Sequence, residues 1–89
     1  MLDDINKAIK YINKGLDIMG RQGPLLYRLA FINFIQEEEQ LGLMNLEEAL
    51  EIDTLGVQEF IDFDPVFILN NENIVNLINE YKSKNNNPF

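Results

Sequence analysis

Residues 25–35 read LLYRLAFINFI, and nine of these eleven positions are apolar. A helix that is apolar on nearly every side is either the central helix of a domain or is half exposed to a partner. Pro24 suits the first turn of such a helix, because the N–H that proline lacks would have no partner there. Three glutamates and then Gly42 follow the apolar run, so we expect a central helix over residues 24–41 that ends at this glycine.

The preceding segment is predicted to form a helix over residues 2–20, because apolar residues recur at helical spacing. This stripe consists of Leu2, Ile5, Ile9, Ile12, Leu16 and Met19. Lys7 and Lys14 fall on the opposite face. The stripe is shorter than about three heptads and its flanking positions hold no charges, which favours a helix packed in a bundle over a coiled coil. Gly20 is a natural stop for this helix.

Two shorter helices are expected beyond the central helix. Asn45, with Glu48 three residues later, resembles a capping box and predicts a helix over residues 46–53. A turn at residues 54–56 then leads to a second short helix over residues 57–63. One bent helix spanning both segments is the alternative.

The last third of the chain carries two further cap signals. Asp64 can cap a short helical turn that begins at Pro65 and runs through residues 66–69, although a strand is the rival interpretation of that segment. Asn71 can cap the final helix, and two lysines near its end, Lys82 and Lys84, complement the helix dipole. The apolar residues of that helix are Ile74, Leu77, Ile78 and Tyr81.

These patterns predict an all-α fold, a compact bundle of four to five helices. Residues 1–84 are expected to form a single helical domain, and residues 85–89 a disordered tail. Met19 and Met44 are interpreted as packing residues. Tyrosines at three helical positions are interpreted as core edges with a wet hydroxyl: Tyr11, Tyr27 and Tyr81.

The composition excludes several kinds of catalysis. The chain of 89 residues has no His, Cys or Trp, which removes a Ser/His/Asp triad, a cysteine nucleophile and a His/Cys zinc site. Asp62 and Asp64 lie among phenylalanines, where two carboxylates could hold magnesium or act as an acid/base pair. No glycine-rich phosphate loop or calcium-loop pattern accompanies them, so they are interpreted as surface carboxylates. We therefore expect no enzyme, with no catalytic residues, no cofactor and no metal.

The net charge of −8 is unevenly distributed along the chain. Residues 1–28 hold five basic and three acidic residues, whereas residues 29–80 hold twelve carboxylates and no lysine or arginine. Such an acidic body repels phosphate backbones and anionic headgroups, so we expect neither nucleic acid nor membrane as a partner. A protein with a basic or apolar surface is expected instead, or a second copy of the chain as a homodimer. The simpler interpretation is that the charge only favours solubility.

Two surfaces are candidates for partner binding. One is acidic and would bind a basic partner in a salt-sensitive manner: Glu37, Glu38, Glu39, Glu47, Glu48 and Glu51, with Glu59 and Asp62 further along the chain. The other is apolar: Leu25, Phe31, Phe34 and Phe67. The acidic start, MLDD, lacks the positive region of a signal peptide, and no apolar stretch is long enough to span a bilayer, so a cytoplasmic location is expected.

The segment NLEEALEIDTLGVQEFIDF, residues 45–63, matches one known pattern in part. With Asn45 in the place of a Ser cap, and with Glu59 and Phe60 in the second half, it resembles the helix-turn-helix of small bacterial antitoxin-like proteins. It departs from that pattern where Thr54 replaces the turn glycine. The resemblance implies a degenerate helix-turn-helix. Because the second helix carries carboxylates and no lysine or arginine, we expect a protein-binding relic rather than a DNA reader.

The sequence therefore favours a non-catalytic protein–protein interaction module, such as a regulator, adaptor, antitoxin or immunity-type protein. One alternative is an acidic inhibitor, phage-encoded for example, that mimics nucleic acid and blocks a nuclease. That alternative needs carboxylates in line along one face. A further alternative is a DNA-binding helix-turn-helix regulator, which needs the basic residues of 7–28 to converge beside the helix at 57–63.

Overall fold

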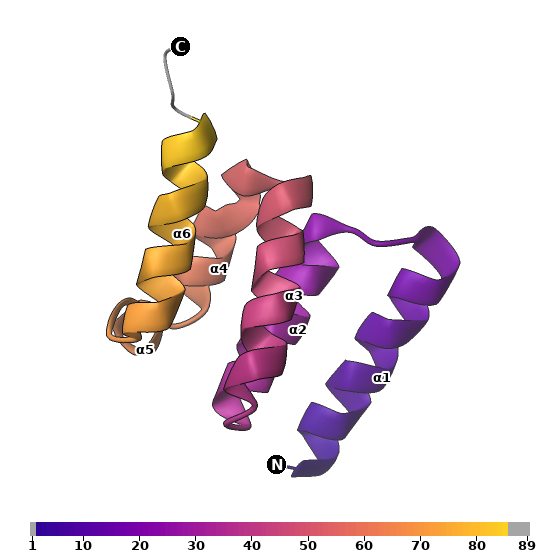
Figure 1. Cartoon of the computed structure of the whole chain (residues 1–89). Coiled ribbons are helices and arrows are strands. Elements are labelled where there is room, and N and C mark those ends of the chain that lie inside the picture. Colours follow the sequence, from indigo (N-terminus) through magenta and orange to yellow (C-terminus); the bar gives the residue numbers. More distant parts are fainter. Residues whose placement is uncertain (1, 86–89) are drawn as a thin grey trace.

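Six α-helices make up the part of the chain that the computed structural model describes, residues 2–85 (Figure 1). In chain order they are α1 (Leu2–Met19), α2 (Gly23–Ile35), α3 (Glu39–Ile52), α4 (Val57–Phe63), α5 (Pro65–Leu69) and α6 (Glu72–Asn85), with a 3₁₀ turn, η1 (Thr54–Gly56), between α3 and α4. These residues contain no strand. The predicted all-α class is confirmed. Within residues 2–85 six helices are present rather than four to five, because the short helical turn expected over residues 66–69 forms the five-residue helix α5.

The layout places α2 and α3 side by side at the centre, and their contact is the most extensive between any two elements. On one side α1 packs against α2, and on the other side α6 packs against α3, so that α1 and α6 lie at opposite edges (Figure 1). The core fills the space between α2, α3 and α4. It extends to α5 and α6, and its most deeply buried side chains are Leu26, Tyr27, Ala30, Leu46, Ala49, Leu50, Phe60, Ile68 and Ile74.

The first helix forms as predicted, and its stripe faces α2. Ile12 and Leu16 are buried, whereas Met19, expected to pack, is mostly exposed at the end of the helix. Gly20 stops α1 in the left-handed conformation (φ 84°), and its N–H donates to the carbonyl of Leu16 at 2.9 Å. Because α1 packs mainly on α2, much of its circumference faces solvent.

The predicted helix over residues 24–41 is wrong, because the chain breaks between α2 and α3. Glu37 adopts a left-handed backbone (φ 63°), and the N–H of Glu38 donates to the carbonyl of Asn33 at 2.9 Å, which closes α2. Gly42 is therefore not a stop but an interior residue of α3. A Cβ at this position would lie 2.9 Å from the ring of Phe34, so the glycine is needed for close packing of α3 on α2.

The predicted capping box at Asn45 is also wrong. Asn45 lies in the middle of α3 and is buried, and its Nδ2 donates to Oδ1 of the buried Asn33 on α2 at 2.8 Å. The helix begins at Glu39, seven residues before the predicted start at 46. An asparagine side chain can cap a helix or form a hydrogen bond with another buried polar side chain, and Asn45 does the second.

The remaining boundaries follow the predicted local signals. The turn at η1 separates α3 from α4, so the interpretation as two helices is confirmed over the bent helix. Asp64 accepts from the N–H of Phe67 at 3.2 Å and caps α5, so the helical turn is confirmed and the strand is wrong. Asn71 caps α6 by accepting from the N–H of Ile74 at 3.1 Å. Of the predicted tail, Asn85 ends α6, and residues 86–89 lie outside the described residues.

Two of the three tyrosines are buried as predicted. The hydroxyl of Tyr27 donates to the carbonyl of Asp53 at 2.6 Å, and that of Tyr81 donates to Oε1 of Glu51 at 2.9 Å. Burial raises the pKa of both hydroxyls. Tyr11 is instead 77% exposed, which contradicts its prediction as a core edge. Met44 is likewise mostly exposed rather than packed.

The buried amide pair provides a test of the α2–α3 contact. Asn33→Leu leaves the amide of Asn45 buried without a partner, and we expect a loss of about 1–3 kcal/mol in the free energy of unfolding. The double variant Asn33→Leu/Asn45→Leu removes both partners and should lie closer to the wild type than either single variant. Urea unfolding measures all four proteins. Losses that simply add in the double variant would contradict a coupled pair.

Gly42 provides a second test, with Gly15 as its matched control. Both lie inside helices, where alanine gains about 0.5–1 kcal/mol. At Gly42 the new Cβ meets the buried ring of Phe34, and overpacking costs about 1–3 kcal/mol, so Gly42→Ala should destabilise. At Gly15 the nearest atom, 3.0 Å away, is the end of the Leu25 side chain, which can move, so Gly15→Ala should stabilise. Opposite shifts in melting temperature are expected; shifts of the same sign would count against the packing role of Gly42.

Candidate interaction site

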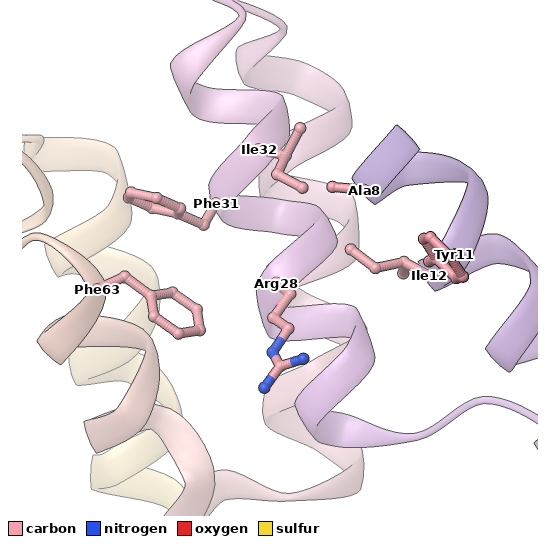
Figure 2. Close-up of a pocket in the computed structure, with 7 residues that line it drawn as sticks. All are labelled: Ala8, Tyr11, Ile12, Arg28, Phe31, Ile32 and Phe63. Atoms are coloured by element: carbon pink, nitrogen blue, oxygen red, sulfur yellow. The ribbon is translucent and has the colours of Figure 1, made fainter. Parts of the chain in front are cut away.

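A surface groove with a volume of about 350 Å³ lies between α1 and α4, with α2 between them (Figure 2). We refer to it as the α1–α4 groove. Its lining residues are Ala8, Tyr11 and Ile12 of α1, Arg28, Phe31 and Ile32 of α2, and Phe63 of α4. Six of the seven are apolar or aromatic, so the groove offers mainly hydrophobic contact.

Helical periodicity explains which side chains line the groove. On α1 and on α2 the lining residues occupy positions i, i+3 and i+4, which share one face of a helix. The helix α2 is apolar nearly all round, and its side with Asn33 meets α3. The side with Arg28 and Phe31 is thereby left for α1 and α4, which cover it only in part.

Aromatic side chains form the wall of the groove on the α4–α5 side. The ring of Phe31 lies 5.3 Å from that of Phe63 and 6.3 Å from that of Phe67, measured between centroids. Phe63 and Phe67 are nevertheless 40% and 38% exposed, and Tyr11 across the groove is 77% exposed. We call Tyr11, Phe63 and Phe67 the aromatic rim.

The predicted apolar surface is brought together only in part. Phe31 and Phe67 meet beside the groove, as their contact shows. Phe34 is buried in the core instead, where it packs against Phe60. Leu25 is half-buried and packs against α1 at Gly15.

The charged residues on the α1 and α2 walls of the groove are cations. The guanidinium of Arg28 extends from α2 into the space between Phe63 and the residues of α1 (Figure 2). It makes no hydrogen bond or ion pair with any residue that the structure describes. Lys7, Lys10 and Lys14 gather around Tyr11 on the adjoining face of α1. No carboxylate lines the groove, although Asp62 and Asp64 adjoin Phe63 on the α4 wall, so the positive charge lies on the α1–α2 side.

The predicted acidic residues are spread over several places, and four of them contact residues outside their own helix. Glu48 accepts from Nε and Nη2 of Arg21 at 2.7 and 2.6 Å, and this bidentate hydrogen bond lowers the pKa of its carboxyl. Glu47 and Glu51 both accept from the hydroxyl of Tyr81, at 3.3 and 2.9 Å. The carboxylate of Glu39 accepts from the side-chain amides of α6 residues at 3.1 Å: Asn71 and Asn73.

The other four lie elsewhere. Glu37 and Glu38 occupy the corner between α2 and α3, and Glu59 and Asp62 lie on the exposed side of α4, where Asp62 accepts from Gln58. Among the described residues no three carboxylates come together as a metal site would require. A role of these eight residues in partner binding stays a prediction.

Three residues of the groove were not predicted from the sequence as binding residues: Tyr11, Arg28 and Phe63. Tyr11 follows Lys7 by four positions and so belongs to the lysine face of α1, not to its apolar stripe. Arg28 is the one cation within the apolar run of residues 25–35. Both positions can be recognised in the sequence. That Tyr11 and Arg28 line one groove, however, depends on how α1 and α4 pack on α2, which is a tertiary property.

The segment at residues 45–63 forms a helix, a turn and a helix in chain order, as α3, η1 and α4. Asn45, which the resemblance aligns with a Ser cap, is an interior residue of α3. Comparison of the chain with protein-family models, curated proteins and solved structures finds no match. Within the described residues no helix combines the length and the apolar character needed to cross a bilayer.

The Arg21–Glu48 pair predicts a measurable pKa change. Arg21→Gln removes the bidentate hydrogen bond, so the pKa of Glu48 should rise toward its ordinary value. Because the folded-state pKa is depressed, the pair's contribution to stability is present above the unfolded pKa and is lost as pH falls through the folded pKa. NMR titration of the carboxyl carbon measures the shift. Lys84→Gln, at a cation of α6, should leave Glu48 unchanged, and an unchanged pKa in Arg21→Gln would contradict the pairing.

Proposed function

We propose that this chain is a non-catalytic protein–protein interaction module and that the α1–α4 groove is its main binding surface. The single observation that carries the proposal is an apolar groove whose aromatic rim remains exposed. Apolar patches left open on soluble domains are typically binding sites, and aromatic residues and arginine are enriched in interfaces. Tyr11, Phe63 and Arg28 supply those residue types at one place.

The acidic residues support the same class of function in a second way. Carboxylates at the α2–α3 corner and on α4 are exposed, and they would steer a basic surface of a partner during encounter. Those on α3 already contact Arg21 and Tyr81, so they also hold α3 to its neighbours. A regulator, adaptor, antitoxin or immunity-type protein fits this arrangement.

The two alternatives receive less support from the geometry. A mimic of nucleic acid needs carboxylates in line, yet Glu47 and Glu51 are directed to α6 while Glu48 is directed to Arg21. A DNA reader needs the basic residues of 7–28 to converge beside α4. Arg28 does lie beside Phe63, but α4 itself carries Glu59 and Asp62 with no lysine or arginine, and these carboxylates would repel phosphates.

Affinity capture with paired baits tests the proposal. Wild type, Tyr11→Ser and Leu55→Ser are immobilised and exposed to lysate of the native host, and captured proteins are identified by mass spectrometry. Tyr11 is in the rim, whereas Leu55 is 92% exposed but outside the groove. We expect wild type and Leu55→Ser to capture the same protein and Tyr11→Ser to lose it. Purified partner and chain should then bind at a one-to-one ratio.

Three results would contradict the proposal. One is capture of nucleic acid instead of protein, and another is equal capture by all three baits. The third is turnover of a small molecule by the purified chain.

A further inference from the structure

The charge and shape of the α1–α4 groove identify the kind of partner, and this step rests on the proposed function. We propose that the groove binds an acidic amphipathic helix of another protein, with apolar side chains between Tyr11 and Phe63 and a carboxylate paired with Arg28.

Charge complementarity carries the acidic part of the proposal. Arg28 lies in the groove without an ion-pair partner among the described residues, and Lys7, Lys10 and Lys14 flank Tyr11. If an apolar partner without a carboxylate covered the groove, the guanidinium of Arg28 would lose its hydrogen bonds to water and form no new ones. Burying an unpaired charge in this way is costly. A glutamate or aspartate on the partner offsets that cost through a charge-assisted hydrogen bond.

Local charge outweighs the net charge of −8 at this place. At physiological ionic strength the Debye length is about 8 Å, so exposed charges further away are largely screened. Arg28 lines the groove and three lysines flank its α1 wall, whereas Asp62 and Asp64 adjoin Phe63 on the α4 wall. An acidic segment is therefore attracted to the α1–α2 side of the groove although the protein as a whole is acidic.

Helical spacing supports the second part of the proposal, which is that the bound segment is a helix. The α1 and α2 walls present residues at positions i, i+3 and i+4, and such ridges accept the ridges of a third packed helix. Recognition of a helix in a groove uses anchors at i, i+3, i+4 and i+7, which match that spacing. The described residues include no strand, so they offer no sheet edge to which an extended peptide could add.

Other occupants fit the groove less well. A symmetric dimer through this face would bring the cations of both copies, Lys7, Lys14 and Arg28, into one interface, and like charges would repel. A small molecule needs a site that buries about 70–90% of its surface, whereas the wall residue Tyr11 is itself 77% exposed.

Binding of a synthetic peptide to the full chain tests the proposal. The probe is a fluorescein-labelled helix of about 18 residues with Leu and Phe at i, i+3, i+4 and i+7 and Glu at the flanking positions. Its first twin carries Lys in place of Glu, and its second twin carries a central Pro that breaks the helix. Fluorescence anisotropy gives each Kd, and circular dichroism confirms that each protein variant folds.

We expect the acidic helix to bind at least about tenfold more tightly than either twin. Arg28→Glu should weaken the acidic helix by about tenfold or more and strengthen the Lys twin. Lys82→Glu is the matched control, because it makes the same charge change on α6 at the opposite edge of the molecule (Figure 1). It should leave the Kd within about twofold, as expected for a remote, screened charge.

Equal binding of the acidic helix and its twins, or equal effects of Arg28→Glu and Lys82→Glu, would overturn the proposal. Arg28-dependent binding of duplex DNA or of anionic lipid vesicles in preference to the acidic helix would also overturn it, as would a homodimer that Tyr11→Ser dissociates. A captured host protein that binds through Tyr11 with a basic segment overturns this inference but leaves the proposed function standing. If no host protein depends on Tyr11, both fail.

Discussion

The hydrogen bond between Asn45 and Asn33 connects α3 to α2 at 2.8 Å in the buried centre of the molecule. A helix as uniformly apolar as α2 has no single face that must turn inward, so hydrophobic burial alone leaves its rotation underdetermined. An amide buried without its partner is costly, and this cost selects one rotation and one register. Gly42 then lets the ring of Phe34 approach α3 closely. The other helices attach to this pair.

The groove follows from that choice. Once the side of α2 that carries Asn33 is turned to α3, the opposite side, with Arg28 and Phe31, must be covered by other elements. The helix α1 covers one part of it and α4 with α5 another. Among residues 2–85 no further helix lies between them, and the aromatic rim stays exposed. The Asn33–Asn45 hydrogen bond that fixes the rotation of α2 therefore also leaves the opposite side of α2 only partly covered.

Local signals predicted the elements whose ends are fixed locally. Gly20, Asp64 and Asn71 stop or cap helices where the sequence placed them, because each acts through its own backbone or side chain within a few residues. The break at Glu37 was not predicted, because a glutamate with positive φ carries no local signal for it. Asn45 gave a false cap signal because its true partner is twelve residues away. The groove was missed for the same kind of reason: Tyr11 and Arg28 become neighbours only through packing.

Net charge is a weak guide to the partner of such a protein, because charge that serves folding and charge that serves binding look alike in the sequence. Glu48 is held by Arg21, and Glu47 and Glu51 are held by the hydroxyl of Tyr81, so part of the acidic excess links α3 to its neighbours. Arg28 has no such partner among residues 2–85. A charge left unpaired beside an apolar surface is the one that a binding partner must satisfy. If the groove is the binding site that we propose, the few cations of the first two helices are the better guide to its partner than the many carboxylates that follow them.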